Sequence, residues 1–292
     1  AGGGVIPYES IRYDLPTHAN ELNPVPSLIL KVLLEYAPEV GDIESQVSRW
    51  AEEVNSIASD EIDDYFPSSE RGQTPDNYVC TYSIQCNSCG ASIPLVPKWW
   101  IRTRSDGIDV VSKPTIGEDG STSYEVIVDP SEDDLEGFDP SEGPVSRGGD
   151  AECINCGVVT EDGQVRAIFQ SGDFEYEVYC VRYITDDGDQ GFRSPTEEDK
   201  EAFEAAKKRI NSDFELSTFL NDPIPEGNKT SEPQNYGMDE WRDLFSPRQL
   251  VCNYEYVKAI NQIEPSIREQ HDAQTAEAIC TLLVLAFTKL ID

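Results

Sequence analysis

The chain has 292 residues, which is enough for two or three small domains. Hydrophobic residues make up 38% of it and the formal net charge is −34, so a packed core would carry a strongly acidic surface. Apolar periodic segments argue against general disorder, and the acidity argues against an ordinary DNA-binding domain, which is usually basic. At molar salt the Debye length falls to about 3 Å, so salt would screen this self-repulsion. We therefore expect a folded protein from a salt-rich, haloarchaeal-type cytoplasm.

The ends of the chain and its apolar runs limit the class of protein further. The most apolar run, 281–287, is too short to cross a bilayer, and no signal-peptide pattern is present. Since the chain begins Ala-Gly-Gly-Gly and its only methionine is Met238, we expect an internal piece of a longer product. Eight cysteines in a cytoplasmic chain favour metal binding over disulfides.

Residues 1–67 are predicted to form an α/β region. Helical spacing covers 5–13, and a short strand is expected over 17–22. Asn23-Pro24 is typical of a helix start, with Asn as the cap and Pro at the first helical position. A longer helix is expected over 43–65, with one apolar face and Pro67 beyond its end.

Residues 78–185 are predicted to be rich in strands. Apolar and polar residues alternate from Tyr78 to Ile84, which is the period of a strand with one buried face. Between these strands, residues 105–150 contain thirteen acidic and two basic residues, and we expect a loop-rich, solvated insertion there. Further strands are expected at 92–95, 99–103, 124–128, 165–169 and 175–184.

The last region, 194–292, is predicted to be helical. A capping-box pattern from Thr196 to Asp199 opens a helix that extends to about residue 220. A loop is expected over 221–234, and Ser246-Pro247 predicts a second helix start. The final helix is expected over 272–290, and its apolar end favours packing against another part of a longer protein.

Two pairs of cysteines are the strongest local signal. Cys86 and Cys89 form one Cys-x-x-Cys-Gly knuckle, and Cys153 and Cys156 form a second, sixty-four positions further on. Two such knuckles can complete a closed, tetrahedral four-sulfur zinc site, which is structural because no coordination position is left open. The separation exceeds the usual fifteen to twenty residues or so, and the acidic insertion supplies the excess. The alternative is two unrelated thiol pairs or a redox dithiol.

An aromatic and basic segment follows the first knuckle. It reads Lys-Trp-Trp-Ile-Arg-Thr-Arg over 98–104, and on a strand Trp100, Arg102 and Arg104 share one face. Such a face can stack on bases and meet phosphates. The interpretation that we favour is that the tryptophans cover the small core of the ribbon, as tryptophans in small domains usually do.

Three segments, in order along the chain, resemble the large adenine-specific DNA methylases that contain a zinc ribbon. The first is Ala-Gly-Gly-Gly at 1–4, a helix, and then Glu-Leu-Asn-Pro at 21–24. In the family, Asp-Pro-Phe precedes a similar glycine loop, and an acid precedes Leu-Asn-Pro. The second is the first knuckle with the Ile-Pro-Leu-Val-Pro behind it, and the third is Gly-Met-Asp-Glu-Trp-Arg-Asp-Leu-Phe-Ser-Pro-Arg-Gln-Leu at 237–250.

The resemblance implies transfer of a methyl group from S-adenosylmethionine to N6 of an adenine that has left the DNA stack. It implies Gly2 and Gly4 for the cofactor loop and Glu21 for the ribose, within a partial Rossmann-like domain that the zinc ribbon interrupts and helices follow. The family's catalytic Asp-Pro-Pro-Tyr motif is absent from this sequence. We expect it beyond residue 292, or on a second polypeptide, so that this chain has no catalytic residue of its own and is inactive alone. Family roles of this kind include restriction–modification and phage defence, with DNA as the partner.

Two other hypotheses stay open from the sequence. The chain could be a stand-alone zinc-ribbon module that binds nucleic acid or a partner protein without S-adenosylmethionine. It could also be an inert remnant that does not fold alone, which a cooperative melt in concentrated potassium chloride would exclude.

Overall fold

The computed structural model describes residues 3–67, 72–103 and 107–291. The chain divides into two compact units, one formed by residues 1–63 with 249–292 and the other by residues 64–248. The sequence predicted one helical region over 194–292, but its second part, 249–292, packs with the first sixty-three residues. No helix in the described ranges is both long and apolar enough to cross a membrane.

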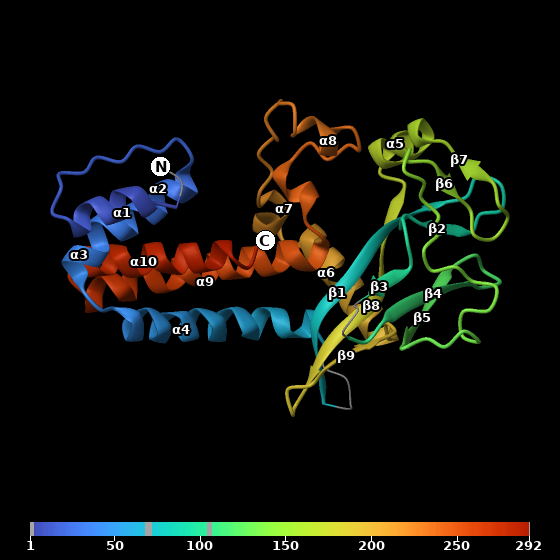
Figure 1. The fold of residues 1–292 in the computed structure, drawn as a ribbon, viewed down its shortest axis with the longest axis horizontal. Helices are drawn as coiled ribbons and strands as arrows, with labels where there is room; N and C mark the ends of the chain where they lie inside the picture. Colours follow the sequence, from blue (N-terminus) through green and yellow to red (C-terminus); the bar gives the residue numbers. More distant parts are fainter. Residues whose placement is uncertain (1–2, 68–71, 104–106, 292) are drawn as a thin grey trace. The chain divides into compact units, whose positions relative to one another are not determined.

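The first unit is helical in all its regular structure. Its core is a bundle in which α4, α9 and α10 lie alongside one another (Figure 1). Trp50 and Val54 of α4, Ile263 and Ile267 of α9, and Ile279 of α10 are buried together there. The elements are α1 (Val5–Arg12), α2 (Pro24–Lys31), the π-helix η1 (Val32–Tyr36), α3 (Ala37–Val40), α4 (Glu44–Ile62), α9 (Pro247–Gln270, whose first residues belong to the second unit) and α10 (Ala273–Thr288).

Local capping sets several of these helix ends where the sequence predicts them. Oδ1 of Asn23 accepts a hydrogen bond of 3.0 Å from the backbone N–H of Val25, and Pro24 opens α2. Asp272 caps α10 in the same way, with Oδ1 at 3.1 Å from the N–H groups of Gln274 and Thr275.

The expected half of an open α/β cofactor domain is not confirmed. Among residues 3–67 the structure describes helices and turns, without a strand, and the strand expected over 17–22 is irregular. All paired strands lie between Gln73 and Arg193 and are antiparallel, which does not fit the parallel sheet of a Rossmann fold. The coarser expectation, a mixed chain of helices and sheets with a cysteine cluster, is confirmed.

The second unit is built on a four-stranded antiparallel sheet with the order β2-β1-β8-β9. Its two long strands, β1 (Gln73–Gln85) and β8 (Phe174–Thr185), are paired along nearly their whole length. The short strands β2 (Ser92–Pro94) and β9 (Gln190–Arg193) pair with the ends of β1 and β8. Because β9 reaches only Val181–Ile184, the first half of β8 has a partner strand on one side only.

Two segments of the acidic insertion are strands of a second sheet, with the order β3-β4-β5. It comprises β3 (Trp100–Arg102), β4 (Val110–Ile116) and β5 (Thr122–Val128), and Val111 of β4 is buried in one cluster with Trp99. The sequence predicted β3 and β5 but missed β4, whose Val110 and Val111 are fully buried. A third, minimal sheet pairs β6 (Ala151–Glu152) with β7 (Val159–Thr160).

Helices complete the second unit, and one of them corrects a prediction. The strand expected over 165–169 is part of helix α5 (Asp162–Ser171), in which Val165 and Phe169 are buried one turn apart. The predicted capping box is confirmed at α6, where the backbone N–H of Asp199 donates a hydrogen bond to the Thr196 hydroxyl at 3.3 Å. The remaining elements are η2 (Asp63–Tyr65), α6 (Glu197–Ser212), α7 (Phe214–Thr218), α8 (Ser231–Gln234) and η3 (Trp241–Leu244).

A buried ion pair ties the start of α6 to β9. The carboxylate of Asp199 is fully buried and accepts hydrogen bonds from the guanidinium of Arg193, the backbone N–H of Thr196 and the hydroxyl of Tyr78. Burial alone would raise the pKa of Asp199, but the hydrogen bonds from Arg193 and Thr196 outweigh it and hold the pKa below its ordinary value. The carboxylate is therefore ionised in the folded protein at neutral pH.

Candidate metal centre

The first cysteine knuckle is the turn between β1 and β2. Cys86 directly follows β1, and its backbone N–H donates to the carbonyl of Ala91 at 2.9 Å. The backbone N–H of Gly90 donates back to the carbonyl of Cys86 at 2.9 Å, which closes the turn. Gly90 has a φ of 75°, so a left-handed residue is required where the chain turns back toward β2.

The second knuckle repeats this geometry between β6 and β7. Cys153 directly follows β6, and its N–H donates to the carbonyl of Val158 at 2.9 Å. The N–H of Gly157 donates to the carbonyl of Cys153 at 2.8 Å, and Gly157 has a φ of 71°. The two Cys-x-x-Cys-Gly segments therefore fold as matching hairpin turns, as their sequences predict.

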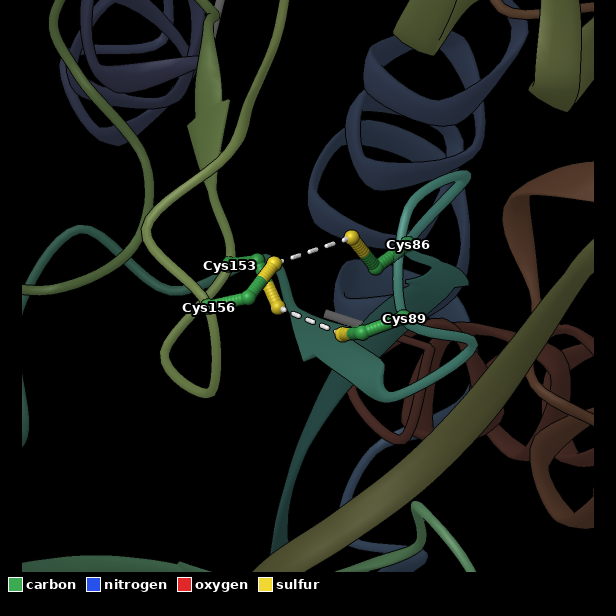
Figure 2. Close-up of side chains that lie close together, drawn as sticks. All are labelled: Cys86, Cys89, Cys153 and Cys156. Carbon is green, nitrogen blue, oxygen red and sulfur yellow. Dashed lines mark hydrogen bonds between the residues drawn. The ribbon is translucent and has the colours of Figure 1, made fainter.

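The fold brings the two knuckles face to face. The sulfur atoms of Cys86 and Cys156 lie 3.7 Å apart, and so do those of Cys89 and Cys153 (Figure 2). All four sulfur atoms lie within 4.8 Å of one another. Four residues from opposite sides of the acidic insertion thus form one cluster that could hold a metal ion.

The spacing of the sulfur atoms fits a tetrahedral ion. Metal–sulfur bonds of about 2.3 Å place the ligands of a tetrahedron about 3.8 Å apart, close to the two distances between the knuckles. Four soft thiolates in this arrangement suit zinc or iron, and they leave no coordination position for a substrate. The cluster can therefore hold the two hairpins together but offers no open site for Lewis-acid chemistry.

One half of the cluster is buried and the other half faces solvent. Cys86 and Cys153 are 3% and 1% exposed, whereas Cys89 and Cys156 are exposed. Burial raises the pKa of the Cys153 thiol to about 12. A bound cation would have to displace this proton, because the thiolate is the ligand.

Asn155 of the second knuckle supports a sulfur atom of the first. Its side-chain amide donates to the sulfur of Cys89 at 3.6 Å. Hydrogen bonds from the backbone of Ala91 and from Asn155 lower the pKa of Cys89 to about 6, which favours the thiolate. Asn155 is not among the residues predicted from sequence, although an amide between two ligand cysteines is a signal that could have pointed to it.

The buried cysteines belong to a small apolar core. Ile84 and Ile93 from β1 and β2, Ala151 from β6, and Val165 and Phe169 from α5 pack around Cys86 and Cys153. The first knuckle therefore packs with side chains from the strands that enter and leave it, the second with Ala151 from the strand that enters it, and α5 contributes to the same core.

The other four cysteines lie outside the cluster, as predicted. Cys180 is fully buried in β8, and Cys80, Cys252 and Cys280 are half-buried. Burial raises the pKa of Cys180 to about 12 and that of Cys80 to about 11, so these thiols remain protonated at neutral pH. They act as small apolar side chains.

The aromatic segment after the first knuckle packs inward in part. Trp99 is 2% exposed and buried with Val96 and Val111. Trp100 is half-buried against the same cluster, and its indole N–H donates to the Ser141 hydroxyl at 3.4 Å. These contacts support the interpretation that the tryptophans pack in a core. Arg104, which was predicted to share a face with Trp100 and Arg102, lies outside the described residues.

The residues predicted for a cofactor site have local roles in the structure. Gly4, with a φ of 80°, precedes α1, and a Cβ at this position would lie 3.0 Å from Leu30 and from Leu33. Oε1 of Glu21 accepts hydrogen bonds from the backbone N–H groups of Leu22 and Asn23, at 2.9 and 3.4 Å. Gly2 lies outside the described residues. S-adenosylmethionine binding by these residues stays a prediction.

Comparison with known proteins leaves the cysteine cluster as the main functional evidence. No protein-family description, no curated protein and no solved structure matches this chain. The likeness to DNA methylases therefore rests on the three sequence segments given above, and the metal centre rests on its own geometry.

Proposed function

We propose that Cys86, Cys89, Cys153 and Cys156 hold one structural zinc ion in a ribbon of two hairpins. The observation that supports this is the approach of four sulfur atoms to within 4.8 Å, across sixty-four positions of sequence. Zinc suits four thiolates in a closed tetrahedron and has no redox chemistry of its own. Its role here is to fix the second hairpin, β6–β7, against the first.

We further propose that this ribbon is part of an adenine-specific DNA methyltransferase that uses S-adenosylmethionine. The order of the three family-like segments supports this proposal, since the cysteine knuckle lies between the glycine loop and the Phe-Ser-Pro-Arg-Gln-Leu segment. The left-handed Gly4 at the start of α1 and the Asn23 cap on α2 are compatible with a glycine loop and a Leu-Asn-Pro turn that precede helices. Methyl transfer itself would require the Asp-Pro-Pro-Tyr motif, which this sequence does not contain.

Elemental analysis of the purified protein tests the zinc proposal by itself. Elemental analysis in concentrated potassium chloride is expected to give about one zinc per chain. About one iron per chain would contradict zinc while keeping the site, and the absence of any metal from natively folded protein would refute the site.

The methylase proposal requires a different assay. The coding DNA around this chain is expected to encode an Asp-Pro-Pro-Tyr segment, in the same frame or a neighbouring one. A protein that contains both this chain and the Asp-Pro-Pro-Tyr segment is then incubated with S-adenosylmethionine and DNA. We expect it to produce N6-methyladenine, which is detected by mass spectrometry of the digested DNA. Unrelated coding sequence on both sides, or no methylated adenine with the joined protein, would refute this function.

A further inference from the structure

A groove in the second unit runs along the half of β8 that has no second partner strand. Strand β8 pairs with β1 from Phe174 onward, but β9 covers only Val181–Ile184. The groove has a volume of about 960 Å³, and residues Phe174–Val178 line it. Thr122–Tyr124 of β5 and Phe203 and Glu204 of α6 also line it.

The side chains that share one face of the sheet at this groove are polar. The strand register places Ser83 opposite Glu175 and Gln85 opposite Ser92, and residues opposite one another point to the same face. Ser83 is only 2% exposed although it carries a hydroxyl. This face is therefore built differently from the other face of the sheet, where aromatic and aliphatic side chains form the core.

The groove lining holds a fixed carboxylate and a hydroxyl without a partner. Glu177 accepts a hydrogen bond from the Ser92 hydroxyl at 2.7 Å and another from the hydroxyl of Tyr124. Oγ1 of Thr122, on the same strand as Tyr124, is buried and has no hydrogen-bond partner in the described part of the chain.

The charge of the groove restricts what can enter it. Five carboxylates and one ammonium group line it, and the residues are Asp119, Asp173, Glu175, Glu177 and Glu204 with Lys200. Lys207 also pairs with two of these carboxylates, Glu175 at 3.3 Å and Glu204 at 4.0 Å, so the acids outnumber the cations by five to two. Phosphate-bearing ligands and a second copy of this acidic chain would be repelled. Two of the aromatic rings at the groove are stacked on protein partners, Tyr176 on Phe203 and Phe174 on Phe169.

We propose that this groove binds an extended, basic segment of a partner protein, which adds as a strand to the free edge of β8. The backbone of the segment would pair with Phe174–Val178, as peptides pair with open sheet edges in other recognition domains. Its alternate side chains, being lysine or arginine, would meet Glu177 and would compete with Lys207 for Glu204. The proposal depends on neither the zinc ion nor the methylase function.

The test uses the full chain and a synthetic probe peptide of alternating valine and lysine, in 1 M potassium chloride. Salt at this concentration reduces the Debye length to about 3 Å and so removes diffuse attraction between the peptide and an acidic protein. Calorimetry is expected to show binding, and hydrogen exchange is expected to slow at the amides of 174–178. A peptide with the same side chains but with alternate backbone nitrogens methylated should bind at least tenfold more weakly, because it cannot pair as a strand.

Matched variants test the role of the groove acids. The double variant Glu177→Gln and Glu204→Gln is expected to bind the probe about tenfold or more weakly, since charge-assisted hydrogen bonds are lost. The control, Glu132→Gln with Glu136→Gln, makes the same change of charge in a segment outside the groove and should bind as the wild type does. Equal binding of the methylated peptide, equal weakening in the control, or no binding of the probe at millimolar concentration would overturn the proposal.

Discussion

Replacement of one buried ligand tests the metal centre most directly. Cys153→Ser removes a sulfur atom that is 1% exposed and lies 3.7 Å from that of Cys89. Structural zinc contributes about 10–16 kcal/mol in small zinc-binding peptides, so an equal share for each of four thiolates is roughly 2.5–4 kcal/mol. At about 1.4 kcal/mol for each factor of ten, the affinity for zinc should fall by roughly 100- to 1,000-fold.

Competition with a chromophoric chelator measures this change in affinity, and mass spectrometry of the intact protein gives the zinc content. The matched control is Cys80→Ser, which changes a half-buried thiol of the same unit that lies outside the cluster. The control should keep one zinc with unchanged affinity. If Cys153→Ser kept zinc as tightly as the wild type, or if both variants lost it equally, the four-sulfur site would be refuted.

Three further changes are expected to have measurable effects. Asn155→Ala removes the amide that donates to Cys89 and should weaken zinc binding by about tenfold in the same competition assay, as loss of a residue behind a metal ligand does. Asp199→Asn leaves the half-buried guanidinium of Arg193 without its charged partner and should lower the free energy of unfolding by about 3–5 kcal/mol at pH 7. The folded-state pKa of Asp199 lies below its ordinary value of about 3.9. The difference in free energy of unfolding between wild type and variant should therefore be complete above that pH and disappear as the pH falls through the folded-state pKa. Denaturant melts of both proteins between pH 7 and pH 3 check this. His271→Ala removes the acceptor, 3.1 Å away, of the indole N–H of the buried Trp50 and should cost about 1–3 kcal/mol, which a thermal melt that stays at the wild-type midpoint would contradict.

The metal centre could be predicted from sequence because its signal is local. Each Cys-x-x-Cys-Gly segment specifies its own turn, through the N–H groups of the knuckle and the left-handed glycines Gly90 and Gly157. The pairing of the two knuckles then follows from ligand chemistry, since each supplies two thiolates and a tetrahedral ion requires four. This pairing does not depend on the length of the intervening chain, so it could be predicted despite the insertion.

Helix ends were also predictable, whereas some strands were not. Asn23, Thr196 and Asp272 cap helices through bonds that reach only two or three residues along the chain. The segment 165–169 is rich in residues that favour strands, yet Val165 and Phe169 lie one helical turn apart and both face the core. There the burial of two side chains on one helix face outweighs the intrinsic preference for a strand.

Strand β4 was missed for the opposite reason. Its surroundings are acidic and contain Gly and Pro, which is typical of a loop. The strand is stabilised by contacts distant in sequence, because Val111 packs on Trp99 and the Ser112 hydroxyl donates to the carbonyl of Tyr179 at 2.7 Å. The composition of a segment does not show such partners.

The structure also explains why a metal is useful in this ribbon. Strands β1 and β8 are joined by eleven paired positions, enough to form without help. Strands β6 and β7 share only two, and a hairpin that short is not stable by itself in water. A long excursion separates Cys89 from Cys153, and the second hairpin contacts the first through the small apolar core around Cys86 and Cys153. Four metal–sulfur bonds would add to this contact, so the proposed ion would stabilise the second hairpin most.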